Sequence, residues 1–341
     1  MPTIDEIARL ARVSPATVSK VLNNRPYVSP TTRARVEQVI AETGFVPSLR
    51  ARGLSARRSF ILGLLIPYRA DQFFADPHLL EIMRGIEAEA NRHGYHLLLS
   101  TARAPREAAG AFSHLLRSDM LDGAILVETL DVQPFAELLR QRPAPWVVIG
   151  YAPPGPAPAV HADDFGGALA ATRHLLGLGH RRLAVISSTP RPSALDERLR
   201  GIRAGLAEAG LTLDSALLVS GDCSLASGEA AAADLLDRPA PPTAIVALND
   251  RMAAGAMRAA IARGLEVPAD LSLVGFDDIA LASLLSPALT TVRQPGYCLG
   301  EAAAATLCGL LGGQAPTTAA VIPTELIVRG SSGPPRAPER G

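Results

Sequence analysis

The residues of this chain best suited to chemistry are two pairs of neighbouring aspartates, Asp163-Asp164 and Asp277-Asp278. Each pair directly follows an apolar run that predicts a β-strand, and paired carboxylates could act there as general acid and base. Polar residues directly after a strand more often bind a ligand or cap the next helix. The chain also has no GxGxxG that opens a helix, no GxxxxGK[ST] and no GxSxG. We therefore predict a binding protein and not an enzyme, with no cofactor and no metal.

A second group of polar residues lies near the N-terminus, where the sequence predicts two short helices. Thr3 and Glu6 have the spacing of a capping box, and Ser14-Pro15 that of an N-cap and first helical position. Apolar residues recur at helical spacing in both segments: Ile4, Ile7, Ala8 and Ala11, then Val18, Val21 and Leu22. The outer surface of the second helix is left to Pro15, Ala16, Thr17, Ser19 and Lys20.

Two short helices joined by a three-residue turn are the layout of a helix-turn-helix, whose second helix reads base edges in the major groove. The alternative is an ordinary helical hairpin within a core. A third helix is predicted to begin at Ser29-Pro30, to present an apolar stripe of Val36, Val39 and Ile40, and to end at Gly44. A basic segment follows at residues 48–58. Both features favour the DNA-binding alternative.

Charge is distributed unevenly along the chain. Residues 1–58 hold ten basic and four acidic residues, a net +6, which leaves 23 basic and 29 acidic residues, a net −6, in the remainder of this 341-residue chain. A basic head on an acidic body indicates a polyanion as the partner of the head alone. We expect no signal peptide and no membrane span. Three cysteines without metal-ligand spacing predict reduced thiols in the cytoplasm.

From residue 60 onward, apolar runs alternate with helical patterns. The predicted strands are Phe60–Pro67, Tyr95–Ser100, Gly123–Val127, Trp146–Gly150, Leu183–Ser187, Thr243–Leu248 and Leu271–Phe276. The predicted helices are Leu79–Arg92, Arg106–Arg117, Phe165–Leu178, Glu197–Ala209, Ser227–Asp237 and Arg251–Arg263. Such alternation predicts parallel sheets covered on both faces, with ligands beyond the carboxyl ends of the strands.

The stretches TIDEIARLARVSPATVSKVLN, VSPTTRARVEQVIAETGFVPS and LRARGL closely resemble the lactose-repressor (LacI/GalR) family of bacterial transcription regulators. The resemblance continues through ERLRGIRAGLAEAGL and AIVALNDRMAAGAMRAAIARGLEVPADLSLVGFDD, to about Arg329. It implies a fold with an all-α helix-turn-helix head and an α/β body of two lobes, similar to periplasmic sugar-binding proteins of type I and linked by three crossovers.

The resemblance also implies domain limits. These are a DNA-binding head at 1–46, a hinge helix or linker at 47–58, an effector-binding and dimerisation body at 59–330 and a tail at 331–341. The first lobe would comprise about 60–157 and 292–320, and the second about 158–289 and 324–328. The tail is rich in glycine, proline and charge, which predicts disorder.

Matching motifs place the effector between the lobes, against Phe73, Phe74, Asp163, Arg198, Cys223, Asn249, Asp250 and Asp277. A guanidinium fork at Arg198 can clasp hydroxyls or a carboxylate. Each residue has a structural alternative. The phenylalanines could pack in the core, Asn249 and Asp163 could cap helices, and Arg198 could form a surface ion pair with Asp196 or Glu197.

Cys223 departs from the family pattern, because many relatives carry a stacking aromatic in the segment that GDCSLASG matches. A thiol offers no stacking platform. The ligand could therefore be smaller, differently posed or not a pyranose, and a cleft that binds nothing stays possible.

On the DNA side, the resemblance implies contacts from Thr3, Ser14, Pro15, Ala16, Thr17, Ser19, Lys20, Asn23, Arg50, Arg52 and Leu54. Lys20, the only lysine of the chain, could donate to guanine O6 and N7 or contact a phosphate. The hydroxyls of Thr17 and Ser19 suit phosphate oxygens. Leu54 matches a hinge-helix wedge that enters the minor groove and kinks the DNA.

Two paired hinge helices would bind a pseudo-palindromic operator, which predicts a homodimer. The tail has no leucine heptads, so we expect no larger assembly. The predicted function is a transcription regulator, a repressor, whose affinity for double-stranded DNA is set by a sugar-like small molecule. The alternatives are a solute-binding protein and a sugar-processing enzyme of the same architecture.

Overall fold

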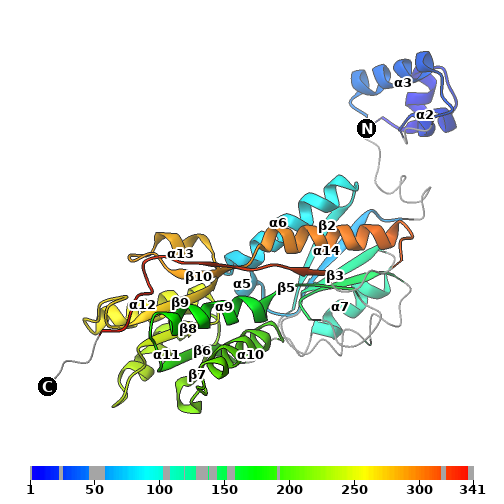
Figure 1. Cartoon of the computed structure of the whole chain (residues 1–341). Coiled ribbons are helices and arrows are strands. Elements are labelled where there is room, and N and C mark those ends of the chain that lie inside the picture. Colours follow the sequence, from blue (N-terminus) through cyan, green and yellow to red (C-terminus); the bar gives the residue numbers. More distant parts are fainter. Residues whose placement is uncertain are drawn as a thin grey trace. The chain divides into compact units, whose positions relative to one another are not determined.

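The computed structural model describes residues 2–22, 26–45, 58–102, 108–118, 120–127, 137, 144–151, 158–189, 193–315 and 320–336. The chain divides into two compact units, Met1–Phe60 and Ile61–Gly341, called here the head and the body. The head is helical, and the body contains all the strands described (Figure 1).

The head consists of α1 (Ile4–Leu10), α2 (Pro15–Leu22) and α3 (Pro30–Thr43). These helices pack around a small apolar core formed by Ile7, Ala8, Ala11, Val18, Val21 and Val36. The predicted capping box is present at Thr3, and Gly44 ends α3 in the left-handed conformation with φ of 62°. The helical periodicity of the sequence therefore predicted the head correctly.

The body contains two six-stranded sheets, each forming the centre of one lobe. The first sheet has the order β11 (Ala320–Ile322), β5 (Ala159–Ala162), β4 (Trp146–Ile149), β3 (Gly123–Val127), β1 (Ile61–Ile66) and β2 (His96–Thr101). The second has the order β12 (Glu325–Ile327), β10 (Thr290–Arg293), β9 (Ser272–Asp277), β8 (Ala244–Ala247), β6 (Leu183–Ser188) and β7 (Leu218–Gly221). All pairs are parallel except β10 with β12. This confirms the predicted α/β class.

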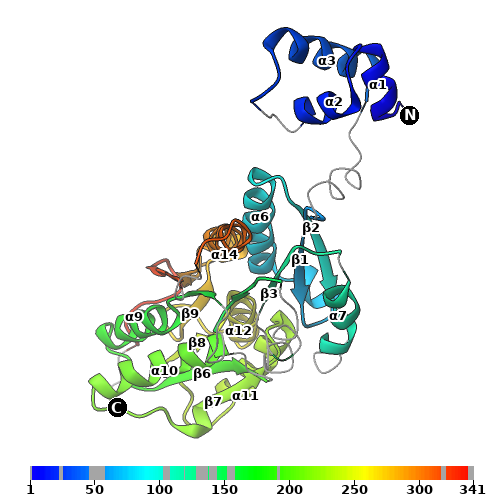
Figure 2. The same ribbon diagram turned by 90° about the vertical axis from the view of Figure 1, so that its right-hand side faces the viewer.

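The first sheet lies between α7 (Ala108–Arg117) on one face and a pair of helices, α6 (Pro77–Arg92) and α14 (Gly296–Leu311), on the other. The short α5 (Ala70–Phe74) precedes α6. The two paired helices lie side by side in both views (Figures 1 and 2). Glycine permits their close approach, since a Cβ at Gly85 would lie 2.0 Å from the Tyr297 carbonyl oxygen, and one at Gly300 would lie 2.0 Å from that of Ile82.

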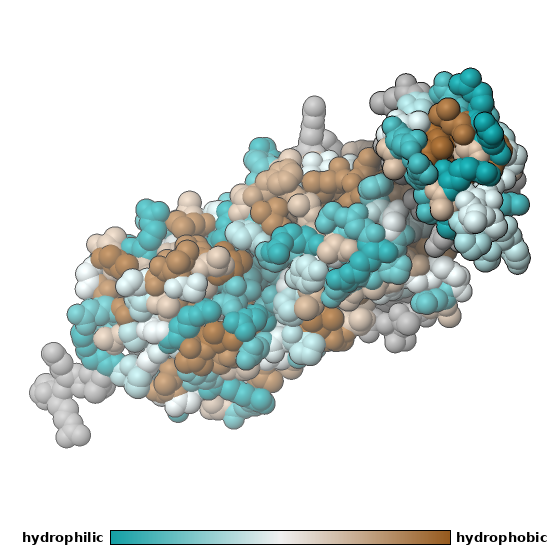
Figure 3. Space-filling model, turned by 90° about the horizontal axis from the view of Figure 1, so that it is seen from above, coloured by the Kyte–Doolittle hydropathy of each residue, from teal (hydrophilic) through white to brown (hydrophobic). Residues whose placement is uncertain are grey.

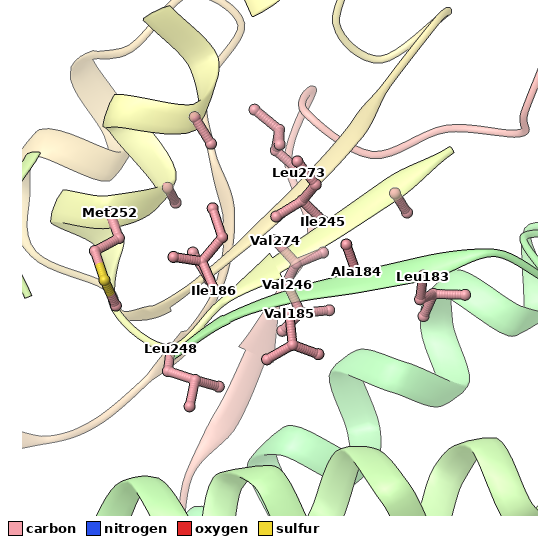
Figure 4. Close-up of a cluster of buried hydrophobic side chains, with 14 of the residues drawn as sticks. Leu183, Ala184, Val185, Ile186, Ile245, Val246, Leu248, Met252, Leu273 and Val274 are labelled. Carbon is pink, nitrogen blue, oxygen red and sulfur yellow. The ribbon is translucent and has the colours of Figure 1, made fainter. Parts of the chain in front are cut away.

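The second sheet lies between two helix pairs. These are α9 (Asp164–Gly177) with α10 (Ser193–Glu208), and α11 (Leu225–Leu236) with α12 (Asp250–Ala262). The short η2 (Ser215–Leu217) precedes β7, and α13 (Ala280–Leu284) follows β9. Branched and linear apolar side chains of β6, β8 and β9 fill the interior (Figure 4), including Leu183, Val185, Ile186, Ile245, Val246, Leu273 and Val274.

The lobe limits differ from those implied by the resemblance. β5 belongs to the first sheet, although residues from 158 onward were assigned to the second lobe. β10 belongs to the second sheet and extends to Arg293, beyond the expected limit of 289. Both strands are only four residues long, and the sequences AVHA and TTVR contain no continuous large apolar run that periodicity could detect.

The chain passes between the sheets three times, and two of these crossovers are hydrogen-bonded to each other. The Asp163 backbone N–H donates to the Ile322 carbonyl oxygen at 2.9 Å, and the Thr324 hydroxyl donates to the Asp163 carbonyl oxygen at 3.0 Å. The third crossover follows β10 at Gln294, before α14 begins. The number of crossovers is as the resemblance implied.

The expectation of a disordered tail from residue 331 is wrong for residues 331–336. The Ser331 hydroxyl donates to the Leu273 carbonyl oxygen at 2.7 Å and accepts the Thr290 N–H at 2.8 Å. The Gly333 carbonyl oxygen lies 2.9 Å from Nε2 of the buried His180. Glycine and proline content does not report such bonds, which depend on side chains distant in sequence. Residues 337–341 lie outside the described part of the chain.

Apolar side chains also reach the surface. In the space-filling view, brown residues on the visible face form small groups separated by teal ones (Figure 3). Among the described residues, no helix is long and apolar enough to cross a bilayer.

Candidate functional site

The outer face of α2 carries the predicted DNA-contacting residues. Pro15, Ala16 and Lys20 are exposed, whereas Val18 and Val21 on the opposite face are buried against α1 and α3. The α2 helix therefore presents one lysine and a short, small-residue N-terminus to solvent. This is a surface that can approach the floor of a DNA groove.

Hydroxyl groups fix the starts of the helices that present this face. The Ser14 hydroxyl accepts the Thr17 N–H at 3.2 Å and lies 2.9 Å from the Thr17 hydroxyl. The Thr3 N–H donates to a Glu6 carboxylate oxygen at 2.8 Å. Ser14 and Thr3 are exposed, while Thr17 and Ser19 are half-buried. Thr3, Ser14 and Thr17 thus hold local structure, whatever else they contact.

Four predicted DNA-contacting residues lie outside the described part of the chain. These are Asn23, which follows α2, and three residues of the hinge segment, Arg50, Arg52 and Leu54.

In the body, Arg198 of α10 is the centre of a buried polar cluster. Its Nε donates to Asp164 Oδ1 at 2.8 Å, and its Nη1 donates to the Leu248 carbonyl oxygen and lies 3.4 Å from Asp277 Oδ1. The guanidinium carbon lies 3.7 Å from the centre of the Phe276 ring. Only 6% of Arg198 is exposed. The alternative of a surface ion pair with Asp196 or Glu197 therefore does not apply.

Asp277 ends β9 with a positive φ of 108°, which aspartate adopts more readily than most residues. Its Oδ1 accepts a hydrogen bond from Gln294 Nε2 at 2.8 Å, in the crossover that precedes α14. Burial raises the pKa of Asp277 to about 6, although Arg198 and Gln294 oppose this rise by stabilising the carboxylate. Asp277 therefore joins α10, β9 and a crossover in one polar contact.

The Asp163-Asp164 pair divides its roles between the two residues. Asp163 caps α9, because its Oδ1 accepts the Gly166 N–H at 2.8 Å, and it is exposed. Asp164 is buried and binds Arg198 through Oδ1, while its Oδ2 accepts the Tyr151 hydroxyl at 3.3 Å. The sequence analysis singled out Asp163, but the structure places Asp164 in the polar cluster. The first residue of a helix and its cap are one position apart, so sequence alone could not separate them.

Asn249 and Asp250 have structural roles in the second lobe. Asn249 Oδ1 caps α12 by accepting the Met252 N–H at 2.8 Å, and its Nδ2 donates to the Cys223 carbonyl oxygen at 3.1 Å. Asp250 is fully buried and accepts the Ile279 N–H at 2.9 Å and the Thr291 hydroxyl at 2.5 Å.

The carboxylate of Asp250 occupies the space beside β9 where a side chain would otherwise point. A Cβ at Gly275 would lie only 2.2 Å from Asp250 Oδ1, so this position of β9 accepts glycine alone. Asp250 therefore connects α12 to β9 and β10 within the lobe, and its carboxylate is already bonded on both oxygens.

Cys223 lies between β7 and α11 with a φ of 67° and is half-buried. Burial raises the pKa of its thiol, so the sulfur is neutral near pH 7. It offers a small, weakly polar surface between these two elements.

The two predicted phenylalanines of the first lobe differ in environment. Phe73 is 1% exposed and packs in the core, as the structural alternative proposed, whereas Phe74 is 55% exposed. Their rings meet edge to face with centroids 5.1 Å apart.

Three residues of the first lobe that the sequence analysis did not select act on the same polar cluster. Asp76 caps α6 by accepting the His78 N–H at 3.0 Å, and burial and then the charge of Asp277 raise the pKa of Asp76. Burial lowers the pKa of His78 to about 4, with a further contribution from Arg198. Burial, Asp76 and Cys223 raise the pKa of Tyr68.

These electrostatic effects place side chains of the first lobe beside those of the second lobe. Tyr68 follows the first strand directly, and Asp76-Pro77 has the signature of an N-cap and first helical position. The sequence contained these signals, but the side chains that face the other lobe became clear only from the fold.

Comparison with known proteins decides the family. Residues 3–48 match the model described as "Bacterial regulatory proteins, lacI family", and residues 172–332 match a "Periplasmic binding protein-like domain". The chain is 35% identical over 334 residues to the HTH-type transcriptional repressor CytR of Escherichia coli strain K12, covering 97% of this chain and 96% of that protein. The chain belongs to the LacI family.

Solved structures of LacI-family proteins share this architecture. The Lac repressor dimer bound to operator and the anti-inducer ONPF is 29% identical, with a TM-score of 0.87 over 97% of this chain and 99% of that chain. A CelR–cellobiose complex is 33% identical, with a TM-score of 0.76 over 97% of this chain and 100% of that chain. The prediction of the family, the fold and a regulator of transcription is confirmed. The solute-binding-protein and enzyme alternatives do not fit these relatives.

Proposed function

We propose that this LacI-family regulator binds a pseudo-palindromic DNA operator as a homodimer and releases or retains it in response to a sugar-like effector held between the lobes. The observation that carries the effector assignment is the polar cluster around Arg198, where Asp164 and Asp277 of the second lobe interact electrostatically with Asp76 and His78 of the first. A ligand there contacts both lobes at once, so its binding depends on how they are arranged.

The DNA side of the proposal is based on α2 and on the charge of the head. Its exposed face, with Pro15, Ala16 and Lys20, is assigned to base edges, and Ser14, Thr17, Ser19, Thr3 and Asn23 to the flanking phosphates. Arg50, Arg52 and Leu54 are assigned to a hinge helix in the minor groove. The Lac repressor structure, a dimer bound to operator, supports both the partner and the homodimer.

The effector side is based on the donor and acceptor set. Guanidinium, carboxylate and carboxamide groups are suited to hydroxyls, and the cellobiose complex of CelR supports a sugar-like class. Arg198 and Asp277 are assigned to direct contact, with Cys223 and Phe74 lining the site. Asp163, Asn249, Asp250 and Phe73 are assigned to positioning, because their polar groups cap or bridge elements or their rings are buried.

The proposed domain limits follow from these roles. They are a DNA-binding head at 1–46, a hinge at 47–58 and a body from 59 to about 336, in the cytoplasm where operator DNA is found. The effector changes operator affinity by its differential affinity for the two lobe arrangements.

Fluorescence anisotropy of a labelled operator, with and without a sugar panel, tests the proposal. The full chain should bind operator, and one sugar should change the dissociation constant at least fivefold. Arg198→Ala should remove that change, whereas Arg200→Ala, whose side chain is exposed, should preserve it. A sugar response that survives in Arg198→Ala would disprove the effector site.

The DNA side has its own test. A chain that lacks residues 1–58 should lose operator binding and keep sugar binding. If that shortened chain still bound operator specifically, the assignment of the head would be wrong.

A further inference from the structure

We propose that the effector site takes an uncharged polyhydroxyl ligand and rejects phosphorylated and carboxylated ones, with Tyr68 and Ser187 supplying hydroxyl groups that the ligand alone satisfies. This inference rests on the proposed function, because it concerns the ligand of the same site.

The first observation is a pair of buried hydroxyl groups without partners. Tyr68 is 9% exposed and Ser187 is 0% exposed, and neither hydroxyl has a hydrogen-bond partner among the described residues. Buried hydroxyls are nearly always hydrogen-bonded, because a desolvated polar group destabilises the protein. Each of these two hydroxyls therefore has room for a hydrogen-bond partner from outside the described residues.

Both hydroxyls lie at the carboxyl end of a strand, Tyr68 after β1 and Ser187 in β6. Asp76 of the first lobe and Cys223 of the second both act electrostatically on the Tyr68 phenol, so this group lies between the lobes. Ser187 lies on the face of β6 opposite to that of Ser188, because consecutive side chains of a strand point to opposite faces. Ligands of parallel sheets bind at this end of the strands. Tyr68, from the first lobe, therefore lies near Cys223 of the second lobe.

The second observation is the balance of charge. The cluster contains the buried carboxylate of Asp164 and the half-buried carboxylates of Asp76 and Asp277, and Asp277 raises the pKa of Asp76. Arg198 is already bonded to Asp164, to Asp277 and to the Leu248 carbonyl oxygen. His78 is neutral at pH 7, because burial lowers its pKa to about 4.

The other guanidinium that acts on this group, Arg251, opposes the rise in the pKa of Asp76. The cluster thus contains more negative than positive charge, and its central cation is shared by two carboxylates. A phosphate dianion placed here would face like charges at short range and in a buried environment, where repulsion is strong. Neutral hydroxyl groups instead donate to carboxylates and accept from Tyr68 and Ser187.

Matched ligand pairs test the assignment on the full chain. The probes are D-ribose and ribose 5-phosphate, D-glucose and glucose 6-phosphate, adenosine and adenosine 5′-phosphate, and cytidine and cytidine 5′-phosphate. Thermal denaturation at millimolar ligand should show a raised melting temperature with at least one neutral member. Titration calorimetry should show at least tenfold weaker binding of its phosphorylated partner.

Two outcomes would overturn the assignment. One is a phosphorylated member that binds as tightly as its neutral partner or more tightly. The other is a panel that produces no shift. Operator binding is measured on the same samples, because loss of that binding is the failure of the proposed function and not of the ligand class.

Tyrosine variants provide a second, independent test. Tyr68→Phe should weaken the neutral ligand at least fivefold and leave the melting temperature of the unliganded protein unchanged or higher, since it removes an unsatisfied hydroxyl. Tyr151→Phe is the matched control, because its hydroxyl donates to the Ala162 carbonyl oxygen and to Asp164. That variant should lower the melting temperature. If Tyr68→Phe destabilised the unliganded protein as much as the control and kept ligand affinity, Tyr68 would not be a ligand contact.

The charge argument has its own variant. Asp277→Asn keeps the shape and tolerates the positive φ, but it removes one negative charge. In this variant, the ratio of the dissociation constants of the phosphorylated and the neutral partner should fall at least threefold. Unchanged discrimination would show that charge does not exclude the phosphate.

Discussion

At the scale of single residues, the polar cluster around Arg198 makes the folding stability of this protein depend on pH in two opposite ways. The pKa of Asp277 is raised to about 6 and that of His78 is lowered to about 4, both chiefly by burial. The two shifts have opposite effects on stability. The folded protein prefers Asp277 protonated, so its stabilising contribution is complete below about pH 4 and is lost as pH rises through about 6. The folded protein prefers His78 neutral, so its contribution is complete above about pH 6.5 and is lost as pH falls towards about 4.

Single substitutions should separate these two contributions. In Asp277→Asn, the free energy of unfolding should rise more steeply between pH 4 and pH 6 than in the parent, because the opposing Asp277 contribution is removed. The expected difference across this range is about 2 kcal/mol, since each unit of pKa shift corresponds to about 1.4 kcal/mol. Urea denaturation at several pH values measures it. His78→Gln should change the slope in the opposite direction, and parallel curves for all three proteins would refute the assignment.

The sequence predicted part of this cluster and missed the rest for a definable reason. Arg198, Asp277 and Cys223 belong to motifs that are contiguous in sequence, so the resemblance identified them. Tyr68, Asp76 and Asp164 became candidates only from distances and burial, because each lies one to several positions from a residue with a recognisable motif. The sequence does not distinguish the capping residue Asp163 from its neighbour Asp164, which binds Arg198.

At the scale of helices and strands, Asp278 ties the carboxyl end of β9 to the ends of β10 and β12. Its carboxylate accepts Arg293 Nε at 2.8 Å and Arg329 Nη2 at 2.6 Å, at the ends of β10 and β12. The Asp278 side chain is only 8% exposed. Asp277 and Asp278 are adjacent and both have positive φ.

Removing this buried carboxylate should destabilise the body. Asp278→Ala leaves Arg329 largely buried without its partner, and such a change typically costs about 3 kcal/mol. Equilibrium denaturation in urea measures the loss. Glu325→Ala is the control, since this ion pair with Arg293 is exposed and should contribute less than about 1 kcal/mol. Equal losses in the two variants would contradict the role of Asp278.

The start of α2 offers a test in the head. Ser14→Ala removes the hydroxyl that accepts the Thr17 N–H, which should destabilise the head by about 1 kcal/mol. Ser14→Asn retains an N-cap acceptor without adding charge and should preserve most of that stability. Hydrogen exchange of the α2 amides reports the head separately from the body. Protection that is unchanged in Ser14→Ala would show that this cap does not hold α2.

The elements were predicted best where they are long and periodic. Helices α6, α9, α11 and α12 were expected to within three residues at either end, and the apolar strands β1, β3, β6 and β8 were recognised from continuous apolar runs. Helix α14 was not predicted, because its alanine-rich sequence shows no clear apolar stripe. Strands β7, β10 and β11 were not predicted, and β5 was noted only as the apolar run before Asp163, because strands of three or four residues are too short to show a period. Their stability comes from pairing with neighbours far away in sequence, which no local pattern records.

At the scale of the whole molecule, the last described residues, 331–336, belong to the fold. The segment 331–336 bonds β9, β10 and the buried His180, and Arg336 pairs with Asp270 at 2.5 Å. Residues 331–336, which follow β12, therefore complete the second lobe. Chain ends are generally dispensable unless such bonds tie them down.

Two truncations should separate the structural part of the tail from the remainder. A chain that ends at Arg336 should unfold at the same temperature as the full chain. A chain that ends at Gly330 should lose about 2 kcal/mol or more, because the Thr290 N–H and both backbone groups of Leu273 lose their hydrogen bonds to Ser331. His180 and Ser272 also lose the Gly333 carbonyl oxygen. Differential scanning calorimetry measures both. The structure predicts unequal losses, and equal melting temperatures would contradict it.

Lys20 gives the molecule a built-in reporter. It is the only lysine of the 341 residues and is exposed on α2, so an amine-acylating reagent has one side-chain target in the whole chain. Mass spectrometry of the intact protein could then measure the fraction of molecules in which DNA protects Lys20 from acylation. The terminal amine adds one further acyl group, and no labelled operator is needed. The same feature would make a single acetyl transfer sufficient to neutralise the one cation of α2.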